Sequence, residues 1–448
     1  MFWRQTYLKR LSADLDHWAR DGLVDPAKVP AILRAAEEAR GPRALTGILA
    51  VLGVVLLGFA AMSFVAANWS EMSKLARLGV LGGGMWAALG IAVWRIRADA
   101  AARGMHTPEG ERTGGTGYYP GAAVLLAVIL YGVAIMLIGQ MYHVAGSYAD
   151  GLLLWMIGAL VAAWLVPSRA ALALAIVLAP AWSIAVLLDA APGAVSGGLH
   201  WPFLIALAPA SLLAGGMGWR PGMHLVVLAF ATWCGVSGIW LMGELGWPPA
   251  SVIALAALIG LALFAKAHLA IRLIGPFDDL LAHWGLFGLM ATAFWLPLAG
   301  GPDAPLPLHL PAALILAGGA TITAALAWRQ HRLAAADLGI IVGLAAALVA
   351  FPHLRPVQGE AADWLMVVGY FGAAVWCVSY GTRTHDRFAI NLGFTGFGAM
   401  ALYVYFETVG TLLGTAAFFA VGGAVLIGLS IGLERLRRHL IARQGDAA

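Results

Sequence analysis

Charged side chains are scarce in this sequence: Asp, Glu, Lys and Arg make up 11% of the 448 residues, whereas 61% are apolar. Soluble globular proteins contain about 25% charged and about 45–50% apolar residues. This shortage of charge excludes a soluble fold of this length, a disordered chain and a nucleic-acid-binding domain as the main body. The sequence therefore predicts an all-α, polytopic transmembrane helix bundle, in contact with membrane lipids and without a nucleic-acid partner.

Cysteine is almost absent. The two that occur, Cys234 and Cys377, both lie inside apolar stretches, so a disulfide framework is excluded. We expect them to be small packing residues. His and carboxylate residues show no metal-ligand spacing, so the sequence indicates neither a metal nor a cofactor.

Long apolar stretches are what the sequence has in abundance, and about fourteen can cross roughly 30 Å of hydrocarbon. The first begins near Ala44, behind more than forty mixed residues, which predicts a retained span and not a secretory signal peptide. The predicted spans are 44–67, 75–95, 119–141, 150–166, 169–188, 200–218, 223–243, 249–270, 280–298, 310–328, 335–351, 363–380, 388–406 and 410–433.

The basic residues alternate with these spans. All but three of the 27 Lys and Arg lie before the first span, after an even-numbered span or after the last one; the exceptions are Lys74, Arg77 and Arg355. Because Lys and Arg of short loops stay in the cytoplasm, we expect both termini to be cytoplasmic. The predicted location is the bacterial cytoplasmic (inner) membrane.

Residues 1–43 predict a cytoplasmic helical hairpin. Gly22 is expected to end its first helix, and Asp25 followed by Pro26 predicts the N-cap of its second. The hairpin either docks on the membrane surface and inner loops or contacts a cytoplasmic protein partner. The apolar side chains that we select for such a partner are Leu11, Leu15, Trp18 and Ile32.

The rest of the chain divides by composition. We expect a transmembrane hairpin at 44–95, a flexible cytoplasmic linker rich in Arg and Gly at 96–118, a transmembrane bundle at 119–433 and a basic cytoplasmic tail at 434–448. The linker lacks the Lys-Ser/Thr ending of a phosphate-binding loop, so it does not predict a nucleotide site.

Several local patterns together resemble a known family. They are Trp18-x-x-x-Gly22-Leu23-Val24, Ala66-Ala67-Asn68-Trp69, Leu130-Tyr131-Gly132, Ile138-Gly139-Gln140-x-Tyr142-His143, Asp150-Gly151 and Asn391-Leu392-Gly393. They are similar to the bacterial polytopic membrane proteins that carry domain of unknown function 2157. The resemblance covers roughly residues 1–190 and 388–440. It implies a membrane protein without an assigned reaction and supplies no catalytic residue.

Polar residues gather at the predicted outer span ends, while the predicted membrane interior is almost free of ionisable side chains. The candidate ligand-binding residues of this outer rim are Gln140, Tyr142, His143, Asp150, Asn68 and Glu71; Asp189, His200, Glu244, His353 and Glu407 follow along the chain. Gln140 and His143 are three residues apart and share a helix face, and His143 could pair with Asp150 across a short loop. The rim is either a head-group or cation site or a solvated edge.

Two prolines, Pro180 and Pro209, fall in the middle of predicted spans. Each removes a backbone hydrogen bond and is expected to kink its helix. Paired interruptions can mark a transport site, but proline is also ordinary in membrane helices. Small-xxx-small pairs at Gly79/Gly83, Gly339/Gly343, Gly410/Gly414 and Gly428/Gly432 predict close helix contacts within the bundle.

Three function classes remain open. A carrier or flippase-like protein for an amphipathic or lipid-linked cargo would use the many spans, the paired prolines and the outer rim of polar residues. A membrane scaffold, assembly or sensing protein would act through the N-terminal hairpin. An enzyme on lipid-linked substrates is less favoured, because no acid pair or His motif stands at catalytic spacing.

The predicted topology can be tested by cysteine labelling in intact cells. Single cysteines at Ser147, Ser196 or Asp303 should react with an impermeant thiol reagent from outside, and the chain with only its two native cysteines gives the background. Single cysteines at Thr107, Ser168 or Thr384 should react only after lysis. Labelling of the Thr384 variant in intact cells would contradict the predicted order of spans.

Overall fold

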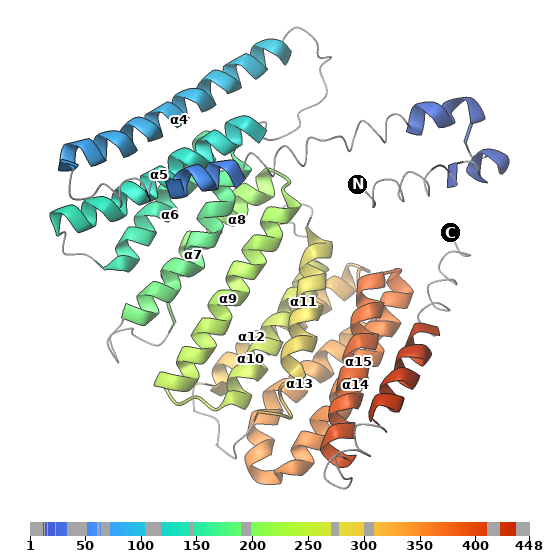
Figure 1. The fold of residues 1–448 in the computed structure, drawn as a ribbon. Helices are drawn as coiled ribbons and strands as arrows, with labels where there is room; N and C mark the ends of the chain where they lie inside the picture. Colours follow the sequence, from blue (N-terminus) through green and yellow to red (C-terminus); the bar gives the residue numbers. More distant parts are fainter. Residues whose placement is uncertain are drawn as a thin grey trace. The chain divides into compact units, whose positions relative to one another are not determined.

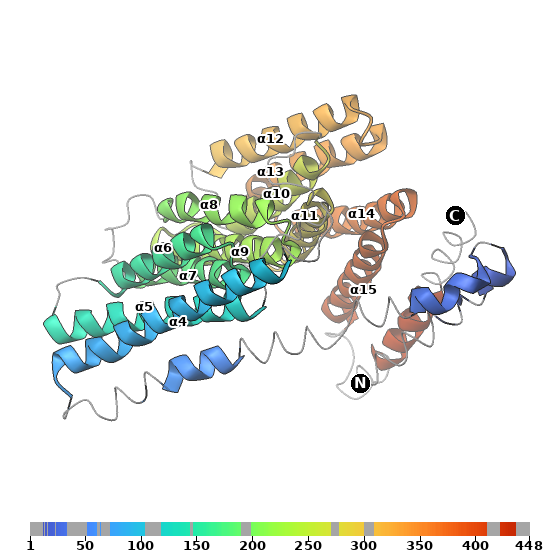
Figure 2. The same cartoon turned by 90° about the horizontal axis from the view of Figure 1, so that it is seen from above.

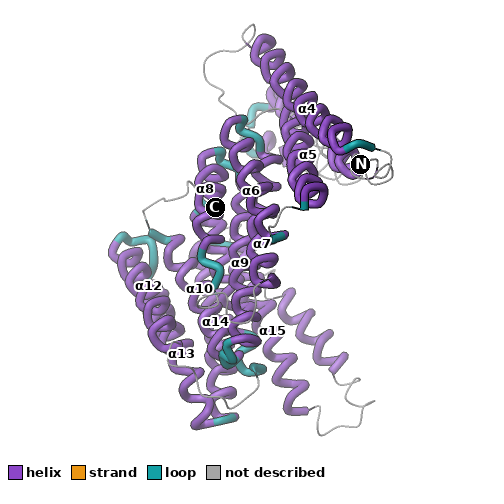
Figure 3. The backbone as a smooth tube through the Cα atoms, turned by 90° about the vertical axis from the view of Figure 1, so that its left-hand side faces the viewer, coloured by secondary structure: helices purple, strands orange, loops and turns teal. Residues whose placement is uncertain are grey.

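The computed structural model is helical in the part of the chain that it describes (Figure 1). That part comprises residues 12, 14–15, 17–22, 24–33, 52–60, 63, 72–103, 118–143, 147–189, 199–269, 277–299, 309–409 and 422–435. Over these residues Figure 3 shows helices and loops and no strand, as the apolar composition predicts.

Twelve long helices have complete bounds. The first four are α4 (Lys74–Arg103), α5 (Tyr118–Tyr142), α6 (Tyr148–Leu165) and α7 (Arg169–Asp189). The other eight are α8 (Pro202–Gly216), α9 (Arg220–Glu244), α10 (Pro249–Ala267), α11 (Asp278–Ala293), α12 (His309–Arg329), α13 (Ala335–Gln358), α14 (Glu360–Thr384) and α15 (Arg387–Val409).

Ten of these helices are long and apolar enough to cross a membrane, namely all except α8 and α11, which have 15 and 16 residues. Each predicted span between 75 and 406 coincides with one of α4 to α15, so the prediction of a polytopic helical membrane protein is confirmed. The predicted spans 44–67 and 410–433 lie largely outside the described residues. The count of fourteen therefore stays a prediction.

The chain divides into two compact units, residues 1–175 and 176–448. In the first unit, α5 packs against both α4 and α6. Gly132 of α5 lies against the indole of Trp155, and Gly158 of α6 lies against the ring of Tyr131, so each helix offers a small residue to an aromatic ring of the other. The Trp155 Nε1–H also donates to the carbonyl oxygen of Val128 at 2.8 Å. The Tyr131-Gly132 motif thus forms the α5–α6 contact.

In the second unit, α10 is the helix with the most neighbours: it contacts α9, α11, α12 and α13. Figure 2 shows α12 and α13 side by side next to α10, and α14 beside α15. Contacts between specific residues give the helix directions. Arg355 pairs with Asp363 and Arg383 with Asp337, so α13 and α14 are antiparallel.

The tightest helix crossing joins α10 to α11. A Cβ placed on Gly285 would lie 2.5 Å from the backbone N of Phe264, and one on Gly260 would lie 2.5 Å from the backbone N of Leu289. Only glycine permits this approach, because any side chain would separate the two backbones. A second crossing, of α14 with α15, uses Gly381 and Gly393 in the same way.

The small-xxx-small pairs do not make these contacts. Among the described residues, a Cβ on Gly79, Gly83, Gly339, Gly343, Gly428 or Gly432 would meet nothing within 4 Å. For the part of the chain that the structure describes, the prediction of close helix contacts at these three pairs is therefore wrong. Gly410 and Gly414 lie outside the described residues. Spacing alone failed because it does not say which helix face meets a partner.

The N-terminal hairpin is described only in part, and as a whole it stays a prediction. Gly22 has φ +75°, the left-handed conformation expected after a helix end. Asp25 caps the short 3-10 helix η1 (Pro26–Lys28), since its side chain accepts a hydrogen bond from the N–H of Ala27 at 3.0 Å. These two local predictions from the sequence are confirmed.

The α10–α11 crossing generates a stability prediction. Gly285→Ala should lower the free energy of unfolding by about 1–3 kcal/mol, because the new methyl overpacks against the backbone of α10. Gly339→Ala is the matched control, since its Cβ meets nothing within 4 Å. Thermal unfolding in detergent measures both. Equal melting temperatures for the two variants would contradict the crossing.

Candidate functional site

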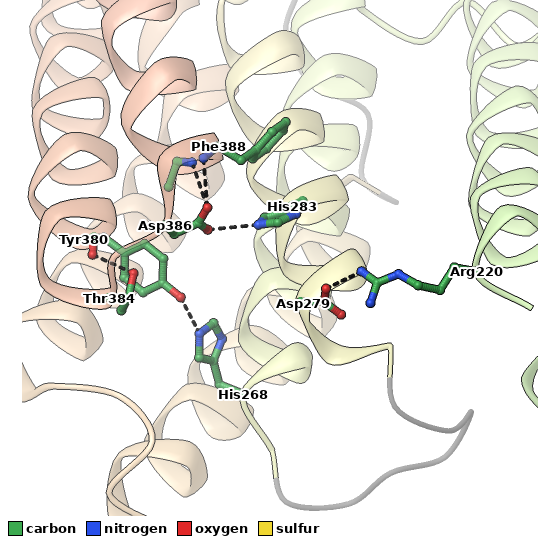
Figure 4. Close-up of polar contacts among 9 residues, drawn as sticks. Arg220, His268, Asp279, His283, Tyr380, Thr384, Asp386 and Phe388 are labelled. Carbon is green, nitrogen blue, oxygen red and sulfur yellow. Dashed lines mark hydrogen bonds and ion pairs between the residues drawn. The ribbon is translucent and has the colours of Figure 1, made fainter. Parts of the chain in front are cut away.

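Basic side chains of the second unit meet at one end of its helices, which we call the basic end. It is defined by Arg220, Lys266, Arg329, Arg332, Arg383 and Arg387, at the start or end of α9, α10, α12, α14 and α15 or in the loop after α12. Figure 4 shows part of it, with polar side chains of α9, α11 and α14, of His268 after α10 and of Asp386 before α15. The basic end coincides with the predicted cytoplasmic side of these spans.

Asp386 joins two helices at this end. Its Oδ1 accepts hydrogen bonds from the N–H groups of Phe388 at 2.9 Å and Ala389 at 3.4 Å, so it caps the start of α15. Its Oδ2 lies 3.0 Å from Nε2 of His283 on α11. Burial alone would raise the pKa of this carboxyl, but His283 and the two backbone N–H groups outweigh it, and the pKa is lowered.

His268 follows the last residue of α10 and binds α14. Its Nδ1 lies 2.8 Å from the carbonyl oxygen of Phe264, which can only accept, so Nδ1 carries the hydrogen. Nε2 then accepts from the Tyr380 hydroxyl at 2.8 Å (Figure 4). Burial lowers the pKa of His268, while Phe264 and the charge of Asp337 oppose the shift. The neutral imidazole is therefore the form that fits this site.

Asp337 is the most buried carboxylate here, with 2% of its surface exposed. It accepts hydrogen bonds from Trp376 Nε1 at 2.9 Å and Arg383 Nη1 at 3.1 Å, and from the N–H of Ala334 at 3.3 Å. Because both oxygens have partners, this side chain fixes α13 to α14 and offers no free acceptor to a substrate.

Two polar contacts join α9 to α11. The Arg220 guanidinium forms an ion pair with Asp279, and both side chains are about half exposed. One turn further along each helix, the Trp284 Nε1–H donates to Nδ1 of His224 at 3.0 Å. Together these four residues form a polar rim between the two helices.

An apolar pocket of about 400 Å³ begins beside this polar rim. Its walls come from α9, α10 and α11, with Trp284 among the lining residues. Of the other polar side chains in the lining, Thr292 donates its hydroxyl hydrogen to the carbonyl of Gly288 within its own helix. Representative lining residues are Phe230, Gly235, Met242, Ile253, Leu263 and Phe287.

Four of the lining residues are glycines: Gly235, Gly238, Gly260 and Gly288. A Cβ on Gly235 would meet nothing within 4 Å, so this position faces free space. Along α10 the lining runs from Val252 to Leu263, a rise of about 17 Å at 1.5 Å per residue. That length is about half of the roughly 30 Å hydrocarbon core, or one leaflet.

The ionisable groups at these places are largely engaged with one another. In the described residues no group of three or more His, Cys, Asp or Glu could hold a metal ion. The acids Asp337, Asp386 and Asp279 are each engaged by a cation or His. No nucleophile with an adjacent free base is found among the polar residues of the basic end described above.

The predicted outer rim is described for four of its six residues. Gln140, Tyr142, His143 and Asp150 are exposed, while Asn68 and Glu71 lie outside the described residues. Asp150 caps α6: its Oδ2 accepts from the N–H of Ser147 at 3.0 Å, and Ser147 Oγ accepts from the N–H of Asp150 at 3.1 Å. No hydrogen bond or ion pair joins Asp150 to His143. Lys74 lies over the Tyr142 ring at 5.1 Å.

The remaining candidate residues are placed as follows. Pro180 and Pro209 lie inside α7 and α8, in helices that continue through them. Of the residues selected for a protein partner, Trp18 and Ile32 are exposed and Leu15 is buried, whereas Leu11 lies outside the described residues. Ligand binding and partner contact at these positions stay predictions.

The basic-end polar residues and the pocket were missed from the sequence. His283 and Asp386 are 103 residues apart, and their meeting depends on helix packing that no local pattern encodes. A usable signal was present in Asp279 and His283, four residues apart and hence on one helix face. The sequence indicates the pocket only weakly, through the glycines that occur in the three successive helices α9, α10 and α11.

Comparison with known proteins supports the family resemblance. The family model described as "Predicted membrane protein (DUF2157)" matches residues 16–172, which confirms the resemblance over that part of the chain. The similarity noted around Asn391 lies beyond the match. No curated protein and no solved structure matches the chain. The chain is thus similar to a family of membrane proteins whose description gives no reaction.

The His268–Tyr380 contact predicts a pH dependence. The pKa of His268 is lower in the folded than in the unfolded protein, so its neutral form supports folding above the unfolded value of 6.5. Stability should fall as the pH drops below that value, by at most about 1.4 kcal/mol per pH unit from this group. Thermal unfolding in detergent at pH 7.5 and 5.5 measures the effect.

His268→Gln should be less stable at pH 7.5 but should lose less on acidification, because glutamine does not titrate. His331→Gln, at an exposed position, is the control and should keep the full acid sensitivity of the native chain. An equal loss in the native and His268→Gln proteins would show that His268 does not carry the pH dependence.

Proposed function

We propose that the protein is a carrier or flippase-like protein for an amphipathic, lipid-like cargo, and that the cargo's apolar tail occupies the pocket between α9, α10 and α11. The observation that supports this is the pocket itself. Its volume of about 400 Å³ falls within the usual range for ligand pockets, about 300–1,000 Å³.

The composition of the pocket fits a hydrocarbon chain. A polar molecule would leave its hydrogen-bonding groups without partners here, because the lining is almost wholly apolar. An acyl chain loses nothing by entering from lipid and gains contact with the aromatic side chains of Phe230, Phe287 and Trp284. The pocket's length of about one leaflet matches a chain that lies along the helices.

The polar rim supports a cargo with a head group. Arg220 and His224 lie at the end of the pocket where Trp284 closes the gap between α9 and α11. Indole groups such as that of Trp284 prefer the head-group level of a membrane. A lipid with its tail in the pocket would therefore bring its head group to the exposed Arg220–Asp279 pair.

Charge favours an anionic head group at this end. The basic end carries the six cationic side chains that define it and four carboxylates, Asp278, Asp279, Asp337 and Asp386, whereas the opposite end has the carboxylates of Glu244, Glu360, Asp363 and Glu407 and the cation Arg355. Anionic lipid head groups are attracted by Lys and Arg near the membrane surface, by about 1 kcal/mol per residue. Anionic head groups are repelled by the carboxylates of the opposite end.

The proposal predicts that filling the pocket stops transport. Gly235→Leu should insert a side chain into the pocket without a clash, because a Cβ there meets nothing within 4 Å. Transbilayer movement of a fluorescent phosphatidylglycerol, read by dithionite quenching in proteoliposomes, should fall to the protein-free rate. Native protein should move the lipid well above that rate.

Gly243→Leu is the matched control: it lies on the same helix, its Cβ also meets nothing within 4 Å, and it does not line the pocket. It should retain the native rate. If native protein moves no lipid, the carrier proposal is wrong, and the scaffold class moves ahead. If Gly235→Leu moves lipid as fast as the native protein, the pocket is not the transport site.

A further inference from the structure

A pair of histidines lies at the opposite end of the second unit, away from the basic end. His309 is the first residue of α12, and His353 lies in the last part of α13. Their ring centroids are 5.4 Å apart with an angle of 51° between the ring planes. His309 is fully buried, with 0% of its surface exposed.

The polar atoms of this pair are not satisfied by the protein. Among the residues that the structure describes, neither Nδ1 nor Nε2 of His309 has a hydrogen-bond partner, and the buried Nε2 of His353 has none. Leaving a buried donor or acceptor unpaired costs about 1–3 kcal/mol each. Three such atoms within one pair of neighbouring rings mark a place where a partner is needed.

We propose that His309 and His353 bind a divalent transition-metal ion such as Zn²⁺ or Cu²⁺. Imidazole nitrogen is a preferred ligand of both ions, and each neutral ring offers one lone pair. The centroid separation of 5.4 Å fits one ion held by a nitrogen of each ring at about 2.0–2.1 Å. Water and backbone oxygen complete the coordination.

The backbone near His353 has carbonyl oxygens that lack the usual helical donor. Pro352 and Pro356 lie inside α13 and lack N–H groups, so they cannot donate to the carbonyl oxygens of Leu348 and Pro352, four residues earlier. These two oxygens therefore lose their usual helical partners; the Pro352 oxygen is next to His353 in the chain and the Leu348 oxygen is five residues before it. Such acceptors suit a hydrated cation.

This site is independent of the proposed transport pocket. The pocket lies between α9, α10 and α11, and neither His309 nor His353 lines it. The pair was not recognised from the sequence, where His353 counted only as part of the polar outer rim. Its two members are 44 positions apart in the chain, on helices that pack as an antiparallel pair.

The test uses the full-length protein without a polyhistidine tag, purified in detergent and stripped with a chelator. Titration with Cu²⁺, followed by electron paramagnetic resonance, should show one bound equivalent with splitting from two imidazole nitrogens. Zn²⁺ should compete for it. His309→Ala and His353→Ala should each weaken Cu²⁺ binding by more than the roughly 10–100-fold that loss of a residue supporting a ligand costs, because each removes a ligand itself.

The control is the double variant His331→Ala/His385→Ala, which removes two exposed histidines and should bind Cu²⁺ like the native protein. If His309→Ala fails to fold, His309→Gln keeps a polar side chain without the imidazole and should show the same weakening. Equal Cu²⁺ binding by the native protein and the His353→Ala variant would overturn the proposal, as would absence of two-nitrogen splitting. The pair would then hold only an ordered water.

Discussion

The contact between the backbones of α10 and α11 at Gly260 and Gly285 is the constraint on which the second unit depends. It brings the two helices closer than any pair with side chains at these positions could come. Within a membrane, where apolar surface gains little by leaving lipid, such close packing is the main source of helix association. The position of α11 relative to α10 then determines which side chains of the two helices face α9.

The pocket follows from that arrangement. Because α11 lies so close to α10, and α9 meets α11 through the Arg220–Asp279 and His224–Trp284 contacts at the basic end, space is left between α9 and α11 further along. The His283–Asp386 and His268–Tyr380 bonds fix α15 and α14 to the same core. The basic end therefore holds the bundle together, and the apolar pocket beside it remains available to a lipid chain.

The sequence predicts the elements better than their pairing. Spans from 75 to 406 were recognisable because a membrane requires long apolar helices, and the Asp25-Pro26 cap was recognisable because its chemistry is local. Gly339 and Gly343 have the spacing of a contact site, yet a Cβ at either position meets no described residue within 4 Å, while Gly260 and Gly285 form the α10–α11 crossing without any shared spacing. The buried His309–His353 pair and the pocket were likewise beyond reach, since they depend on which helix faces meet.

The most direct test of the lipid-binding account is photo-crosslinking with a phosphatidylglycerol that carries a diazirine near the end of its acyl chain, followed by peptide mapping. The account predicts labels on pocket residues of α9, α10 and α11, such as Phe230, Ile253 and Phe287. Labels spread evenly over the exposed apolar faces of all helices, with no enrichment in the pocket, would contradict it.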